Sequence, residues 1–373
     1  MIYLDNAATT SVCDECADAV NSALREHFAN AGSLYDIGFE SQRVVDSCRE
    51  ATAAALGCKQ SEIYFTSGGT EANNIAVLGS ARARKGWANE IVCTGYEHPS
   101  VANSMKQLER EGFKVHFIRP RQDGNIDVDE FLAAVGPKTA LACAMRVNNE
   151  TGAVIDTPAL AEAVKKINRR TAFHCDNVQG FLKHKLALGG TAIDTCSVSA
   201  HKIHGPKGMG AVYIRSGFNI ENVVFGGAQE KGLRPGTENI AYCAGFEAAI
   251  RRASSIKFDP APLKKHLLDR VGELGNIRIN SPQNGSDYIV NLSMIGLRSE
   301  PLLRYLSSRG IYVSSGSACS RGERSHTLTA EQLPDAVIDS AVRVSFCDEN
   351  TLSDVDALID ALVDARKELI NLK

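Results

Sequence analysis

Apolar and polar positions follow two alternating periods through the first two thirds of the chain. Short runs rich in β-branched and aromatic residues predict strands at 62–67, 90–95, 114–120, 139–147, 171–176, 194–200 and 211–215. Between them, apolar residues at helical spacing predict helices at 70–84, 98–112, 128–135 and 157–170. Repeated strand–helix–strand units predict an α/β fold with a mostly parallel sheet covered by helices on both faces.

The pattern changes near residue 256. A helix predicted from Glu238 to Ser254 is followed by KFDPAP, whose two prolines favour a break in the chain and a domain boundary. Strand-like and helical segments then alternate, at 288–295, 301–310, 311–315 and after Asn350. This last third predicts a smaller α+β domain.

Composition narrows the function classes. The 373 residues include 41 basic and 44 acidic residues, a net charge of −3, so no nucleic-acid or anionic membrane partner is expected. The N-terminus lacks a basic leader and no apolar run approaches the length of a membrane span, which favours a cytoplasmic protein. The eleven cysteines are spread singly, mostly in apolar segments, and we expect most to be buried thiols in a reducing compartment.

Polar residues gather where the predicted strands end. Gly68-Gly69-Thr70 follows the first strand and opens a helix, so its free N–H groups could face an anion. The other strand ends are followed by His98, by Asn148 and Asn149, by Asp176 and Gln179, and by Ser199, His201 and Lys202. Because ligands bind beyond the carboxyl ends of parallel strands, these groups predict one site.

Each group alone has a simpler explanation. A Gly-Gly-Thr turn is usually a tight connection, Asp176 could cap a helix, and Lys202 could be a solvated charge. Together they match the parts of a pyridoxal phosphate site: a lysine that forms an imine, a carboxylate for the ring nitrogen and an anion cradle. The Rossmann and P-loop fingerprints do not occur. Cys13-x-x-Cys16 could be a redox pair or half a zinc site, but no second C-x-x-C occurs, so no metal site is expected.

A series of motifs resembles one known family over nearly the whole chain: YLDNAATT, FTSGGTEANN, EHPSV, VNNETG, DNVQG, SAHKIHGPKG, GGAQEKGLRPGTEN, VSSGSACS and VRVSF. Their order resembles cysteine desulfurases of the NifS/IscS type, pyridoxal-phosphate enzymes of the class V aminotransferase group. The resemblance implies a homodimer with the aspartate-aminotransferase fold, type I of the pyridoxal-phosphate transferases. It also implies a large domain over residues 15–256 and a small α+β domain built from residues 1–14 and 257–373.

The resemblance also implies a role for each site residue. Lys202 would carry the cofactor covalently, His98 would stack on its ring and move protons, and Asp176 would pair with the ring nitrogen. The other implied cofactor contacts are Gln179 at the ring hydroxyl, Asn149 beside cofactor and substrate, and Gly69, Thr70, Ser199, His201 and the partner subunit's Thr237 at the phosphate. Arg343 would bind the substrate carboxylate as a two-pronged fork.

Cys319 matches the family's nucleophile. It would take the sulfur of L-cysteine as a persulfide, release alanine, and pass the sulfur to an iron–sulfur scaffold or a thiolation enzyme. Its setting suits this task, since the small polar residues 314–318 would form a mobile tether. Arg321, Arg324 and His326 could favour the reactive thiolate.

Four positions depart from the family pattern: Ala31, Tyr35, Arg146 and Ala228. They leave open the rim of the site, the substrate preference and the acceptor, including whether Cys319 ever binds an iron–sulfur cluster. Alternative functions are a selenocysteine lyase, another pyridoxal-phosphate β-lyase or aminotransferase, and a turnover-deficient partner in a sulfur-transfer complex. The presence of Lys202, His98 and Cys319 argues against the last of these.

Overall fold

The computed structural model describes residues 1–315 and 324–370, and its largest element is a seven-stranded sheet. In spatial order the strands are β2 (Ile63–Thr66), β8 (Gly210–Ile214), β7 (Thr195–Ser199), β6 (Ala172–Asp176), β5 (Thr139–Met145), β3 (Glu90–Thr94) and β4 (Lys114–Ile118). The five strands from β7 to β4 are parallel, and β8 is antiparallel to both of its neighbours. The predicted mostly parallel sheet is therefore confirmed.

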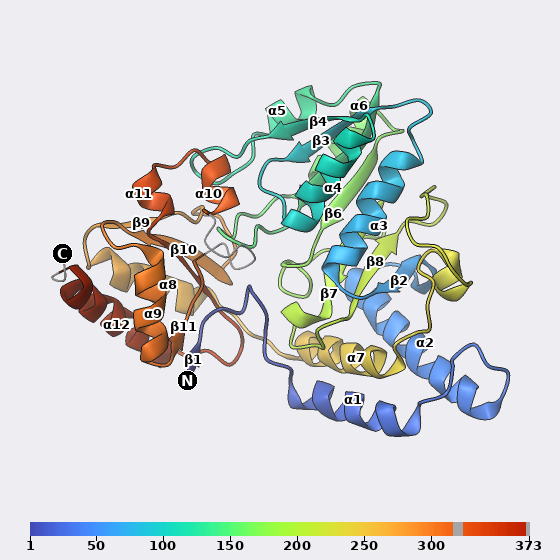
Figure 1. The fold of residues 1–373 in the computed structure, drawn as a ribbon, viewed down its shortest axis with the longest axis horizontal. Helices are drawn as coiled ribbons and strands as arrows, with labels where there is room; N and C mark the ends of the chain where they lie inside the picture. Colours follow the sequence, from blue (N-terminus) through green and yellow to red (C-terminus); the bar gives the residue numbers. More distant parts are fainter. Residues whose placement is uncertain (316–323, 371–373) are drawn as a thin grey trace.

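Both faces of this sheet are covered by helices, as Figure 1 shows. Alternate residues of β5 point to opposite faces. Leu141 and Cys143 share a core with α3 (Gly69–Arg82) and α4 (Pro99–Arg110). Ala142 and Ala144 share another with α2 (Asp36–Leu56), α5 (Val128–Ala133), α6 (Thr157–Ile167) and α7 (Ile240–Ser255). The unbroken apolar run of β5 is thus explained by burial on both sides.

A second, antiparallel sheet belongs to the last third of the chain, drawn in orange and red in Figure 1. It contains β9 (Ile277–Ile279), β10 (Ile289–Met294) and β12 (Ala341–Ser345), and the helices α8 (Ala261–Gly272), α9 (Ser299–Ser308) and α12 (Leu352–Ile370) accompany it. Leu4 joins the hydrophobic core of this part. The N-terminal strand β1 (Ile2–Tyr3) pairs with β11 (Ile311–Tyr312), so both chain ends contribute to it. The domain boundaries drawn from the resemblance are compatible with this pairing and stay a prediction.

The remaining elements are short or link these two parts: α1 (Asp14–Glu26), η1 (Gln60–Glu62), η2 (Ala200–Lys202), η3 (Gln229–Gly232), α10 (His326–Ala330) and α11 (Asp335–Ile338). The pattern of apolar positions did not predict α1 or α2. The buried face of α2 carries small and polar residues such as Gly38, Ser41 and Thr52, which give a weak apolar period. Among the described helices, none combines the length and apolar character needed to cross a bilayer.

Candidate active site

A cavity of 390 Å³ opens at the carboxyl edge of the large sheet. The strand order reverses between β3 and β5, since the chain goes outward from β3 to β4 and then returns to β5. Such a switch point is where open α/β sheets bind ligands. Of the predicted site residues, those that line the cavity are Gly69, Thr70, His98, Asn149, Asp176, Gln179, Ser199, His201, Lys202 and Arg343.

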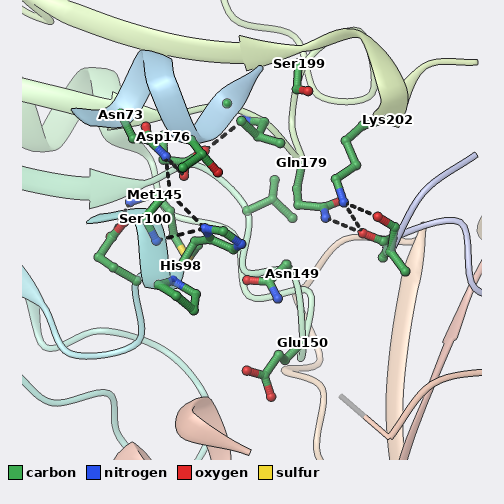
Figure 2. Close-up of a pocket in the computed structure, with 18 of the residues that line it drawn as sticks. Asn73, His98, Ser100, Met145, Asn149, Glu150, Asp176, Gln179, Ser199 and Lys202 are labelled. Atoms are coloured by element: carbon green, nitrogen blue, oxygen red, sulfur yellow. Dashed lines mark hydrogen bonds between the residues drawn. The ribbon is translucent and has the colours of Figure 1, made fainter. Parts of the chain in front are cut away.

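Lys202 reaches the cavity from η2, directly after β7, and is 9% exposed. Its Nζ donates hydrogen bonds to the carbonyl oxygens of Ala7 and Ala8, both at 2.6 Å. Gln179 Nε2 donates to the same Ala7 carbonyl at 2.8 Å, and Figure 2 shows the two side chains converging there. The N-terminal arm therefore orients the amine, although it lies about 195 positions away in the sequence.

Asp176 ends β6 and is held by two donors. Its Oδ2 accepts from Asn73 Nδ2 at 2.7 Å, and its Oδ1 accepts from the backbone N–H of Val178 at 2.9 Å. Asn73 is itself fixed, because its Oδ1 lies 3.0 Å from His174 Nε2 and accepts from the Ser197 hydroxyl at 2.5 Å. A buried carboxylate with this many donors is held in one orientation at the cavity floor.

His98 stands at the N-terminus of α4, and its ring enters the cavity between Asp176 and Asn149 in Figure 2. Its Nδ1 accepts from the backbone N–H of Ser100 at 3.1 Å and lies 2.8 Å from the Ser100 hydroxyl. Since Nδ1 accepts, the proton of the neutral ring is on Nε2. Burial lowers the pKa of His98, which favours this neutral form at pH 7.

The Gly-Gly-Thr turn, where an anion cradle was predicted, lies at the start of α3. Gly68 has φ 148, and a Cβ on Gly69 would lie 2.6 Å from Val178 Cγ2, so both positions require glycine. The first N–H groups of a helix lack partners within the helix and can bind an anion. Ser199 and His201 line the same end, and the buried Ser199 hydroxyl has no hydrogen-bond partner within the described chain. Burial lowers the pKa of His201 to about 3, so its ring is neutral.

Arg343 reaches the cavity from β12 of the second sheet and is 1% exposed. One terminal nitrogen donates to the Asn149 carbonyl at 2.7 Å, and the other binds the Asp5 carboxylate at 2.7 Å. Its Nε has no partner among the residues that the structure describes. A guanidinium has five N–H groups, so one that makes these two hydrogen bonds can still bind a further carboxylate.

Two buried carboxyl groups at the cavity were not predicted. Glu97 precedes His98; its Oε1 accepts from the backbone N–H of Met145 at 2.6 Å, and its Oε2 has no partner in the described part of the chain. Burial raises the pKa of Glu97 to about 8, so it is protonated at pH 7. Burial also raises the pKa of Glu150, whose Oε2 accepts a hydrogen bond from Ser325. The sequence signal that could have indicated Glu97 is its position directly before His98, just after the end of β3.

Cys319 lies outside the described residues, but described residues on both sides of it contact residues of the cavity lining. The backbone of Ser314 exchanges two hydrogen bonds with that of Arg343, at 3.2 and 2.6 Å. On the other side, Ser325 binds Glu150 and His326 lines the cavity. Burial lowers the pKa of His326, which reduces the positive charge that the sequence analysis placed beside the thiol.

The remaining predicted positions lie elsewhere. Thr237 is exposed in the loop before α7 and does not line the cavity of its own chain, so its role depends on a second copy. The four positions that depart from the family pattern, Ala31, Tyr35, Arg146 and Ala228, are also absent from the lining. Arg146, for example, donates to the Ile155 carbonyl at 2.5 Å. Their effect on the rim stays a prediction.

Comparisons with known proteins agree with this architecture. The family model described as Aminotransferase class-V matches residues 2–358. The chain is similar to the cysteine desulfurase IscS of Clostridium botulinum, at 34% identity over 97% of this chain and 93% of that protein.

Solved structures match equally broadly. The chain is similar to a NifS-like protein with a TM-score of 0.92 at 33% identity, covering 98% of this chain and 99% of the other. It is also similar to SspA in complex with cysteine, with a TM-score of 0.83 at 29% identity, covering 93% and 99%. These matches extend over both sheets.

Proposed function

The chain belongs to the aminotransferase class-V family, and from that premise we propose that it is a pyridoxal-phosphate-dependent cysteine desulfurase. It removes sulfur from L-cysteine, releases L-alanine and keeps the sulfur as a persulfide on Cys319. The observation that carries the residue-level proposal is that Lys202, Asp176 and His98 line one cavity at the sheet edge. Its 390 Å³ is in the usual range for a small-molecule site.

The lining fits pyridoxal phosphate. Ser199 Oγ and Gln179 Oε1 are buried polar atoms that no described residue satisfies, so a ligand with polar groups would complete them. The free N–H groups at the start of α3 suit a phosphate, and Asp176 suits a protonated ring nitrogen. When bound, this cofactor supplies an electron sink for the bond that breaks in the substrate.

Each residue of the set then has a task. Lys202 would hold the cofactor through a covalent bond to Nζ, and Asp176 would hold its ring nitrogen in the protonated form. Gln179 would contact the ring hydroxyl. The phosphate would be held by Gly69, Thr70, Ser199 and His201, with Thr237 contributed by a second copy of the chain.

Proton transfer falls to His98. Its neutral ring carries a proton on Nε2, and the backbone of Ser100 fixes this tautomer. Such a group can donate to the substrate, and general acid catalysis of this kind contributes roughly 10²–10⁴ in rate. Buried, protonated Glu97 beside it keeps a second negative charge away from Asp176 at neutral pH.

The substrate carboxylate would bind Arg343, assisted by Asn149. The guanidinium is already aligned by the Asn149 carbonyl and by Asp5, and its Nε–H remains to be satisfied. This places the carboxylate on the side of the cavity formed by the second sheet. The two sheets would therefore each contribute one end of the substrate's binding site.

Sulfur transfer would use Cys319. Its thiolate attacks the substrate sulfur, so a sulfur–sulfur bond forms while the carbon–sulfur bond breaks. The carbon keeps the bonding electron pair and takes up a proton, which gives alanine. The overall exchange of one thiol and one substrate for one persulfide and one alanine needs no outside oxidant or reductant. The contacts of Ser314 with Arg343 and of Ser325 with Glu150, both in the cavity lining, support this role.

The expected setting is a cytoplasmic homodimer that passes sulfur to an acceptor protein. The acceptor would be an iron–sulfur scaffold or a thiolation enzyme. Two copies are needed in this proposal because Thr237 would complete the phosphate site of the other subunit.

The test measures alanine and sulfide formed from L-cysteine by wild type, Cys319→Ala and Lys202→Ala, with Cys58→Ser as a control thiol away from the cavity. We expect loss of both products in the first two variants and wild-type rates in the control. The visible absorbance of the bound cofactor should disappear in Lys202→Ala and persist in Cys319→Ala. Alanine formation at the wild-type rate without Cys319 would contradict the sulfur-transfer step.

A further inference from the structure

A second cavity, of 250 Å³, also has Lys202 in its lining, together with His204, Cys347 and Asp348. One donor atom from each of these last three residues lies within 4.8 Å of the other two. An imidazole nitrogen, a thiol sulfur and a carboxylate oxygen are the donors that zinc prefers in proteins. The cluster joins two distant segments of the chain, so no local motif in the sequence indicates it.

His204 presents the right nitrogen. Its Nδ1 donates to the backbone carbonyl of Ser11 at 3.0 Å. Because a carbonyl only accepts, Nδ1 carries a proton, and Nε2 is the ring nitrogen that could bind a metal ion. This Nε2 faces Asp348 Oδ1 at 3.4 Å. Histidines that bind metals commonly use one nitrogen for the ion and donate the other N–H to a carbonyl.

The Asp348 carboxylate is also held by a neighbouring group. Arg252 donates to Asp348 Oδ2 at 2.6 Å and more weakly to Oδ1 at 3.5 Å, and Oδ1 also faces His204. Cys347 is buried, and its backbone N–H donates to Asn350 Oδ1 at 2.8 Å. The His204 and Asp348 side chains are thus oriented before any ion arrives, which lowers the entropic cost of binding.

The charge of the surroundings limits the kind of ion. Three cationic side chains line the same cavity, those of Arg252, Lys183 and Lys257. They would repel a cation that did not displace the proton of the Cys347 thiol. A soft divalent ion displaces the thiol proton, and the Cys347 thiolate and Asp348 carboxylate then neutralise its two charges. Zinc-like ions meet this condition, whereas Mg²⁺ and Ca²⁺ prefer oxygen ligands alone.

We propose that His204, Cys347 and Asp348, with water as a fourth ligand, bind a zinc-like divalent cation. The bound ion ties the segment that carries Lys202 to the segment that carries Arg343, because His204 follows Lys202 by two positions and Cys347 follows β12. It therefore clamps the two sides of the neighbouring substrate cavity. This inference does not rest on the desulfurase assignment.

The test titrates the purified holoenzyme with Co²⁺, a spectroscopic substitute for Zn²⁺, in the absence of L-cysteine, whose thiol would compete. We expect a saturable thiolate-to-cobalt absorbance at one ion per chain, displaced by Zn²⁺. Cys347→Ser should abolish the band, and Asp348→Asn should weaken Co²⁺ binding at least about tenfold. Zn²⁺ should also raise the thermal midpoint of the wild type but not that of Cys347→Ser.

Two matched thiol variants locate the band. Cys319→Ala and Cys58→Ser should keep both the absorbance and the stabilisation by Zn²⁺. Thermal midpoints measured without metal check that each variant folds. If Cys347→Ser does not fold, Asp348→Asn takes its place as the variant that weakens metal binding. Absence of a saturable band in the wild type, or its loss in Cys319→Ala rather than in Cys347→Ser, overturns the proposal.

Discussion

Glu230 and the cavity around Lys202 are two buried polar regions that differ in how completely their hydrogen bonds are made. Glu230 accepts from both terminal nitrogens of Arg49, at 2.7 and 2.8 Å, and from the backbone N–H of Phe65 at 3.0 Å. In the cavity, four buried polar atoms have no hydrogen-bond partner within the described part of the chain. They are Ser199 Oγ, Gln179 Oε1, Glu97 Oε2 and Arg343 Nε. A completed network stabilises the fold, whereas unsatisfied donors and acceptors converging on one space indicate a ligand site.

The first prediction should show the largest effect and concerns the cavity. His98→Asn keeps a side-chain acceptor for the N–H of Ser100 but cannot transfer a proton at neutral pH. We expect kcat to fall by roughly 10²–10⁴ with little change in thermal midpoint. The matched control, His116→Asn on β4, should keep wild-type kcat. If His98→Asn were unstable but fully active per folded molecule, the prediction would be wrong, because the cavity would then act in folding and not in catalysis.

The second prediction concerns the completed network. Arg49→Ala leaves the buried Glu230 without its cation, so the free energy of unfolding should fall by about 3 kcal/mol. Turnover per folded molecule should not change. Arg43→Ala on the same helix removes an exposed pair with Glu40 and should cost less than about 0.5 kcal/mol. Urea unfolding of the three proteins measures both effects, and equal losses in the two variants would contradict the prediction.

The third prediction follows from the raised pKa of Glu97, about 8 in the folded chain against 4.5 for the free group. Between these values the folded state holds a proton that the unfolded state has lost, so stability should decline as pH rises, by about 1.4 kcal/mol per pH unit. Glu97→Gln should remove this slope. Urea midpoints from pH 5 to pH 9 measure it, with Glu331→Gln as a comparison, since burial raises that pKa to about 8 as well. If the urea midpoints of wild type and Glu97→Gln changed with pH in the same way, the raised pKa of Glu97 would be contradicted.

The smallest effect should appear at two serines of β7. The hydroxyl of Ser199 has no partner in the described chain, so Ser199→Ala should weaken pyridoxal phosphate binding by about 1 kcal/mol, roughly fivefold, without destabilising the cofactor-free protein. Ser197 donates to Asn73 at 2.5 Å, so Ser197→Ala should lower cofactor-free stability instead. Cofactor titration and thermal unfolding separate the two. Loss of apo stability in Ser199→Ala would mean that this hydroxyl is structural.

Much of the large sheet and its ligand edge could be predicted because the signals are local. The run at 139–147 predicted β5, and the polar residues after each strand predicted the cavity. The resemblance added Arg343, which no periodicity connects to that edge. Helix α2 was missed because its buried face is not strongly apolar. Glu97 was missed because a carboxyl group gives no sign in the sequence that burial will leave it protonated.

The sequence by itself determined the alternation of strands and helices between residues 62 and 215, the glycines of the Gly-Gly-Thr turn and the reactive side chains at the strand ends, because each depends on neighbouring residues. Only the tertiary structure decided which distant groups meet. It brought Asp5 to Arg343 across 338 positions, the N-terminal carbonyls to Lys202, and His204 to Cys347 and Asp348. Such contacts, and the pKa shifts that burial causes, depend on how whole layers pack, which no local pattern encodes.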